Sequence, residues 1–92
     1  MPRPRTKRRI SLRPNVLFYK PQGIPLKNLK NVEISLEEWE ALRLKNVKNL
    51  NQTEAALKMH TSQSTFQRIL NTAQKKIASA IINGWAIKII KY

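Results

Sequence analysis

Residues 51–70, NQTEAALKMHTSQSTFQRIL, contain two helix starts separated by a break of three residues. Asn51 and Glu54 form a capping pair, because the Asn oxygen accepts a backbone hydrogen bond while the Glu reaches back toward the cap. Ser62 is a second capping residue. The spacing predicts a helix over 51–58 and another starting at 62, joined by a corner that consists of Met59, His60 and Thr61.

The second of these helices is predicted to be long. Its expected range is 62–82, with Gly84 as the C-terminal stop, because apolar residues recur at steps of three and four: Phe66, Ile69, Leu70, Ala73, Ile77, Ala80 and Ile81. The opposite face begins with polar side chains, namely Gln63, Ser64, Gln67, Arg68 and Asn71. Such side chains bind base edges and phosphates, Gln being suited to adenine and Arg to guanine. An ordinary helical hairpin with a solvated outer face fits the spacing alone equally well.

The net charge favours a polyanionic partner. The chain has 18 Lys and Arg against 5 acids, a formal charge of +13 over 92 residues, and a pI near 10.9. All five acids lie between Glu33 and Glu54, so the segments on either side carry only cations. This excess is larger than solubility requires and is typical of proteins that bind nucleic acid.

Residues 1–14 are expected to form a basic N-terminal arm. The opening MPRPRTKRRI has two prolines and five cations, and it is too polar to fold by itself. Such an arm can follow the phosphate backbone or enter a narrow minor groove. A solubilising tail is the alternative. The candidate arm contacts are Arg3, Arg5, Lys7, Arg8 and Arg9.

Residues 15–92 are expected to form one domain of the mainly α class. Ser35 and Glu38 form a capping box for a first helix over about 35–46. Strand-forming residues cluster near 15–20 and near 86–91, and these two segments can pair within one chain or between two. The prediction is therefore three helices, at about 35–46, 51–58 and 62–82, with a small β element.

No sequence pattern indicates secretion or membrane insertion. No apolar stretch follows the basic start, and no apolar run approaches the about 20 residues of a transmembrane helix. The absence of Cys excludes disulfides and thiolate metal sites. These observations fit a cytoplasmic, nucleoid-associated protein.

The segments together resemble a family known as domain of unknown function 134, predicted DNA-binding proteins whose helix-turn-helix is similar to region 4 of bacterial sigma factors. The matching residues cover nearly the whole chain: the PRPR start with Arg8 and Arg9, Phe18, Lys20, Pro21, residues 23–26, residues 40–44, residues 52–70, Lys75, Lys76, Gly84 and Ala86. The resemblance implies a sigma region 4-like fold and double-stranded DNA as the partner.

The chain departs from the family pattern in three places. The corner residue that is usually Gly is His60, and the apolar residue usually found after it is Thr61. His tolerates a left-handed backbone better than most side chains, so the corner remains feasible, while the angle between the helices is left open. Family members often carry Cys near the N-terminus. This chain has none, so no metal or redox role is carried over.

The combined interpretation is a transcriptional regulator that binds double-stranded DNA sequence-specifically, with 62–71 as a recognition helix in the major groove. The base-reading candidates are Gln63, Ser64, Gln67 and Arg68. Similarity to repressor motifs implies that Gln52 contacts a backbone phosphate and braces Gln63. Ser62 and Thr65 are candidates for capping or phosphate contact, and the remaining phosphate candidates are Asn71 and Lys75.

Catalysis is not expected. His60 is the only His and lies at the corner, where a structural role is favoured over proton transfer. Glu37, Glu38 and Glu40 lie in the first turns of a helix, where acids complement the helix dipole. No phosphate loop, nucleophile elbow or metal-ligand spacing occurs. We expect no catalytic residue, no metal and no cofactor.

Other partners stay open. The chain can dock on RNA polymerase, as sigma region 4 does, or bind RNA, although the aromatic residues form no evident stacking platform. A homodimer is a further alternative, because an apolar stripe follows the alternating steps of a short coiled coil, although such a stripe is usually a domain core. A membrane-surface helix is disfavoured, since few cations lie on the long helix. The stripe is made of Phe66, Leu70, Ala73, Ile77 and Ala80.

Overall fold

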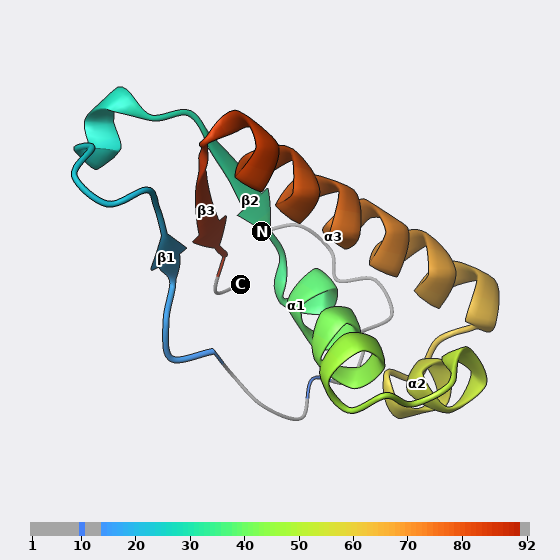
Figure 1. Cartoon of the computed structure of the whole chain (residues 1–92). Coiled ribbons are helices and arrows are strands. Elements are labelled where there is room, and N and C mark those ends of the chain that lie inside the picture. The colour runs from blue at the N-terminus through green and yellow to red at the C-terminus, as the bar shows by residue number, and fades with distance from the viewer. Residues whose placement is uncertain (1–9, 11–13, 91–92) are drawn as a thin grey trace, which may run out of the picture.

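The computed structural model describes residue 10 and residues 14–90. The chain is mainly helical and carries a small three-stranded sheet, which confirms this part of the expected fold (Figure 1). The five predicted arm contacts between Arg3 and Arg9 lie outside the described residues. The elements are β1 (Phe18–Tyr19), the 3-10 turn η1 (Leu26–Asn28), β2 (Asn31–Ile34), α1 (Leu36–Leu42), the π-helical segment η2 (Arg43–Val47), α2 (Gln52–Lys58), α3 (Gln63–Asn83) and β3 (Ala86–Ile89).

The first helix begins at the predicted capping box and changes its hydrogen bonding part of the way along. Ser35 Oγ accepts from the Glu38 amide at 3.1 Å, and Glu38 Oε1 accepts from the Ser35 amide at 2.9 Å. Past Leu42 the backbone hydrogen bonds span five residues instead of four, as in a π-helix. The Lys48 amide, for example, donates to the Arg43 carbonyl at 2.9 Å. The helix predicted over 35–46 is therefore an α-helix followed by a π-helical turn.

The second and third helices begin and end within one residue of their predicted bounds. Asn51 Oδ1 accepts from the Glu54 amide at 2.8 Å, and Glu54 Oε1 accepts from the Asn51 amide at 3.4 Å. Gly84 ends α3 in the left-handed conformation, with φ of 70°. The sequence predicted these bounds because capping depends only on residues three or four positions apart.

The sheet has the order β1-β3-β2, with the last strand of the chain at its centre. β3 runs antiparallel to β1, with Phe18 opposite Lys88, and parallel to β2, with Ile34 opposite Ile89. The two predicted strand segments thus pair within one chain, although each is shorter than predicted. β2 was not predicted. Its only sequence sign is the alternation of Val32 and Ile34 toward the interior just before the α1 cap.

Two apolar clusters form the core, and α3 contacts both as it runs from α2 to the sheet (Figure 1). The first cluster surrounds Phe66, which is fully buried, and its other members are Ala41, Leu44, Ala55, Ala56, Met59 and Leu70. The second consists of Ile34, Leu36 and Ile89, with Ile77 packed against it. The stripe from Phe66 to Ala80, for which a coiled-coil seam was the alternative, is therefore part of the chain's own core.

The prediction that Ile81 lies on the buried face is wrong. Its side chain is 71% exposed, although Ala80 directly before it is buried. Successive helical residues point about 100° apart, so Ile81 lies at the edge of the buried stripe and beyond the elements that cover it. The next residue, Ile82, is 81% exposed.

Two ion pairs between described residues hold α1 in place. Lys76 Nζ on α3 donates to Glu38 Oε1 at 3.0 Å and to the Glu33 carbonyl oxygen at 2.7 Å, joining α3 to α1 and β2. Arg43 donates two hydrogen bonds of 2.8 Å to Glu40, which is fully buried. The hydrogen bonding of Arg43 to the Glu40 carboxylate raises the pKa of Arg43 above its usual value. A bidentate pair with a buried acid fixes the point where α1 passes into η2.

Replacing the buried aromatic tests the first cluster. Phe66→Ala should lower the free energy of unfolding by about 3–5 kcal/mol, because it removes a fully buried ring and leaves a cavity. The control is Leu57→Ala, an exposed position on α2 that should change stability by less than about 0.5 kcal/mol. Urea unfolding followed by circular dichroism measures both, and equal stability of the two variants would show that Phe66 is not the centre of the core.

Candidate nucleic-acid interface

The corner between α2 and α3 is closed by backbone hydrogen bonds around His60. His60 adopts the left-handed conformation with φ of 56°. Its amide donates to the Leu57 carbonyl at 3.0 Å, and the Thr61 amide donates to the Ala56 carbonyl at 3.0 Å. This pair of bonds is the Schellman arrangement, which usually has Gly at the left-handed position. The His found at the usual Gly position is therefore accommodated without loss of the corner.

The start of α3 is held by a small network of hydroxyl groups. Ser62 Oγ accepts from the Thr65 amide at 3.1 Å and lies 2.9 Å from Thr65 Oγ1. It also lies 3.3 Å from Ser64 Oγ. The expected capping role of Ser62 is confirmed, whereas phosphate contacts by Ser62 and Thr65 stay predictions.

The four base-reading candidates lie together on the first turns of α3. Gln63, Ser64 and Arg68 are exposed, and Gln67 is half-buried. Gln67 Nε2 donates to Asn71 Oδ1 at 3.1 Å, one turn further along. That bond limits the rotamers of Gln67 while leaving its second N–H and its Oε1 available. The structure therefore brings these side chains onto one surface next to the corner.

The phosphate candidates flank this surface, and the structure adds two cations to them. Lys75 is exposed further along α3, and Gln52 is half-buried at the start of α2. Gln74 Nε2 donates to Asn46 Oδ1 at 3.0 Å, which ties η2 to the side of α3. Lys45 and Lys48 lie close to Asn46 in the sequence, and Lys45 is half-buried while Lys48 is exposed. Sequence reasoning missed them because they follow a run of acids, and nothing local predicts the contact between Gln74 and Asn46.

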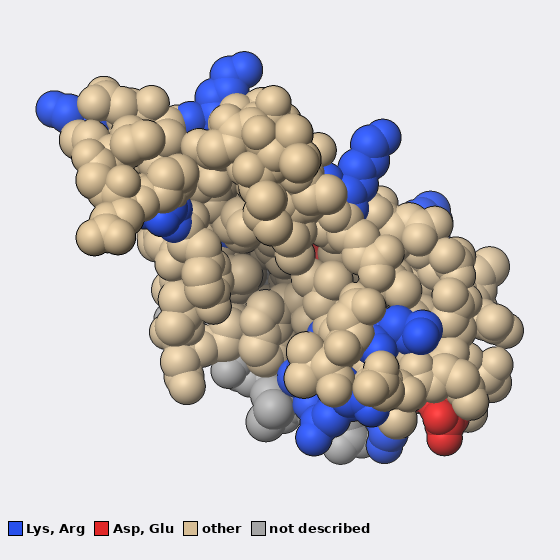
Figure 2. Space-filling view, viewed as in Figure 1, with Lys and Arg blue, Asp and Glu red and all other residues tan. Residues whose placement is uncertain are grey.

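Among the charged side chains on the visible face, the basic ones far outweigh the acidic ones (Figure 2). In Figure 2, Lys and Arg project around the outline of the molecule and over the end that holds η2 and α2, while acidic atoms come to the surface mainly at one point beside α2. Two of the five acids, Glu38 and Glu40, are buried and bound to Lys76 and Arg43. The positive potential at the surface is therefore opposed by few exposed carboxylates.

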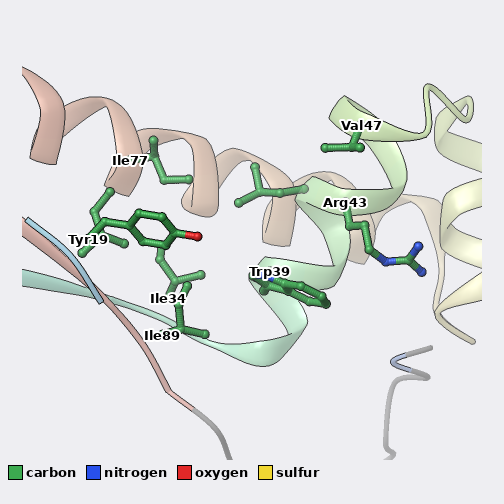
Figure 3. Close-up of a pocket in the computed structure, with 9 residues that line it drawn as sticks. Tyr19, Ile34, Trp39, Arg43, Val47, Ile77 and Ile89 are labelled. Atoms are coloured by element: carbon green, nitrogen blue, oxygen red, sulfur yellow. The ribbon is translucent and has the colours of Figure 1, made fainter. Parts of the chain in front are cut away.

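An apolar pocket lies on another part of the molecule, between the sheet and the helices α1 and α3. It has a volume of about 370 Å³, and six aliphatic side chains line it together with Tyr19, Trp39 and Arg43. Figure 3 shows the Tyr19 ring extending across the pocket, while the Arg43 guanidinium points away from it. The described lining includes no carboxylate, His or Ser, so it offers shape and apolar surface rather than acid–base chemistry.

Two searches of the described part of the chain are negative. No three His, Cys, Asp or Glu side chains lie close enough together there to hold a metal ion. Among the same residues, no helix has the length and apolar character to cross a bilayer.

Substitutions at His60 test the left-handed corner. His60→Val should lower the free energy of unfolding by about 1–2 kcal/mol, because a β-branched side chain fits poorly at positive φ. His60→Gly should be at least as stable as the parent, since Gly has no Cβ to strain the backbone. Thermal melting of the two variants and the parent measures this difference, and a Val variant as stable as the Gly variant would contradict the corner geometry.

Comparison with known proteins places the chain among proteins of closely similar sequence. A UPF0251 protein of Dehalococcoides mccartyi strain BAV1 is 53% identical over 97% of this chain and 76% of its own length. The UPF0251 proteins of Halothermothrix orenii and Moorella thermoacetica are 47% and 45% identical over 96% and 97% of this chain, which covers 65% and 60% of their lengths.

No solved structure matches the chain. One family model matches residues 1–91, a span that includes both the corner and the sheet. The chain therefore belongs to the family described as protein of unknown function DUF134.

Proposed function

We propose that this protein is a transcriptional regulator that binds double-stranded DNA, with α2 and α3 acting as a helix-turn-helix of the sigma region 4 type. The observation that carries the proposal is the exposed polar surface on the first turns of α3, next to a corner closed by backbone hydrogen bonds, in a chain of charge +13. Recognition helices of this motif enter the major groove with their N-terminal residues. Gln63, Ser64, Gln67 and Arg68 then face base edges.

Cations on both sides of α3 supply the contacts that position the protein. Lys75 lies beyond the base-reading residues, and Lys45 and Lys48 are close in sequence to Asn46, which accepts a hydrogen bond from Gln74 of α3. Contacts of Lys with phosphate fix orientation without reading sequence. In this proposal Gln52 and Asn71 add hydrogen bonds to the DNA backbone, and the arm from Arg3 to Arg9 adds charge along the duplex.

Two side chains are suited to direct readout. Gln67 retains a free N–H and its Oε1 beside the bond to Asn71, which together match the N7 and N6 of adenine. Arg68, exposed on the next position, matches the two acceptors of guanine. RNA binding has less support, because Phe66 is buried and Trp39 lines the apolar pocket rather than the surface of α3.

The salt dependence of binding tests the electrostatic part of the proposal. If about six to eight phosphates are neutralised, the logarithm of affinity should fall with log salt at a slope of about −5 to −7. Fluorescence anisotropy on a labelled duplex between 50 and about 300 mM salt measures this slope. Removing residues 1–9 should flatten the slope while the melting curve stays that of a folded domain.

A slope near zero would rule out DNA as the partner. Docking on RNA polymerase would then be the hypothesis to test. An unfolded truncated chain would assign residues 1–9 to the fold rather than to binding.

Substitutions on α3 separate base reading from phosphate contact. Gln63→Ala should lower affinity for a selected cognate site by about 1–3 kcal/mol and leave random-sequence binding almost unchanged, because it removes a base contact. The matched control Lys75→Ala should weaken both by similar factors. Both positions are exposed on the same helix, so melting temperatures should stay close to the parent.

The cognate site for this experiment comes from selection of bound fragments out of a random pool. Equal losses on cognate and random DNA for Gln63→Ala and Gln67→Ala would show that this surface does not read bases. A sequence-selective loss for Lys75→Ala would mean that the helix sits differently in the groove.

A further inference from the structure

One stripe of exposed residues runs the length of α3 on the side away from the core. Its members follow alternating steps of four and three, so they share one face of the helix: Ser64, Arg68, Asn71, Lys75, Ala78 and Ile82. The stripe is polar and cationic as far as Lys75 and apolar beyond it. Ile81, 71% exposed, widens this apolar end beside Ile82.

The apolar end of the stripe lies in the longest uncharged segment of the chain. Residues 77–87, IASAIINGWAI, contain no charged side chain, although a quarter of all residues are charged. Copies of a chain with net charge +13 repel one another wherever their cations face each other. An acidic protein or a nucleic acid would instead contact the cations. An uncharged apolar surface is where two copies of such a cationic molecule can meet without bringing their charges together. The partner that fits this surface is therefore a second copy of this chain.

We propose that a second copy docks on Ala78, Ile81 and Ile82, with the C-terminal ends of two α3 helices packed together about a two-fold axis. Such an interface is self-complementary, because each copy offers the same isoleucines to the other. The pairing does not use the stripe from Phe66 to Ala80, which the core already occupies. Two isoleucines per copy bury much less than the about 1,200 Å² of a stable interface. The free dimer is therefore weak.

The proposed dimer can place its two α3 helices in two successive major grooves of one DNA duplex. This part of the inference rests on the proposed function. The middle of the base-reading residues, between Thr65 and Phe66, lies about 25 Å along α3 from Ile82, at 1.5 Å per residue. Two such segments stand about 34 Å apart, one turn of DNA, when the two helices diverge by about 85°. Each α3 helix then runs from its major groove up to the two-fold axis. The same exposed stripe therefore faces DNA at its Ser64 end and the partner copy at its Ile82 end. Binding to one duplex raises the effective concentration of the two copies and strengthens the weak contact.

A single introduced cysteine tests the interface without DNA. The chain has no Cys, so Ile82→Cys supplies the only thiol. A residue next to a two-fold axis meets its own copy within disulfide distance. Under mild oxidation at high protein concentration, Ile82→Cys should form a disulfide-linked dimer at least ten times faster than Leu57→Cys, the matched control on α2 with 69% exposure. Equal rates for the two variants, or no dimer from Ile82→Cys, would overturn the proposal.

A charge substitution gives a second readout. Ile82→Lys should abolish the concentration-dependent sedimentation of the parent, while Leu57→Lys should not alter it, and both should melt as the parent does because both positions are exposed. Identical sedimentation of Ile82→Lys and the parent would count against the interface. DNA binding is measured separately on a single half-site. We expect Ile82→Lys to lose self-association and to bind a single half-site as the parent does. A parent that dimerises but binds no DNA would refute the proposed function without affecting the proposed interface.

Discussion

The burial of one aromatic ring among alanines sets the geometry of the helical part of the molecule. Phe66 is fully enclosed, and its neighbours include Ala41 of α1 and Ala55 and Ala56 of α2. Alanines on two helices let both axes approach the third closely, and a large ring on α3 fills the space that they leave. The corner at His60 and the cap at Ser62 join two helices whose relative position this contact fixes.

The helices of this chain could be predicted because the interactions that define them are local. The boxes at Ser35 and Asn51 join residues three apart, and the stop at Gly84 depends on one backbone conformation. The clustering of the base-reading candidates on α3 follows from the same short-range periodicity. Family membership extends the match to the whole domain, although it adds no function to what the residues themselves suggest.

The features that escaped prediction depend on contacts between distant residues. Lys76 binds Glu38 and Glu33 across 38 and 43 positions, and Gln74 reaches Asn46 across 28, so no spacing rule indicates them. β2 exists because β3 returns to pair with it, and Ile81 is exposed because the described elements that bury Ala80 do not extend over the neighbouring side of α3. The apolar pocket likewise appears only when the sheet meets α1 and α3. Each of these features is determined by tertiary packing rather than by the local conformational preference of its residues.

The position of β3 at the centre of the sheet affects how the protein is made. β1 and β2 do not pair with each other, so neither has a neighbour until residues 86–89 are available. During translation, β2 leaves the ribosome roughly 3–10 s before its partner strand at usual elongation rates. The helical corner can assemble in that interval, because its contacts close short loops. The sheet therefore forms after the helical corner, and a ribosome that stalls before Ala86 leaves the backbone N–H and C=O groups of β2 without the partner strand that they bind in the folded protein.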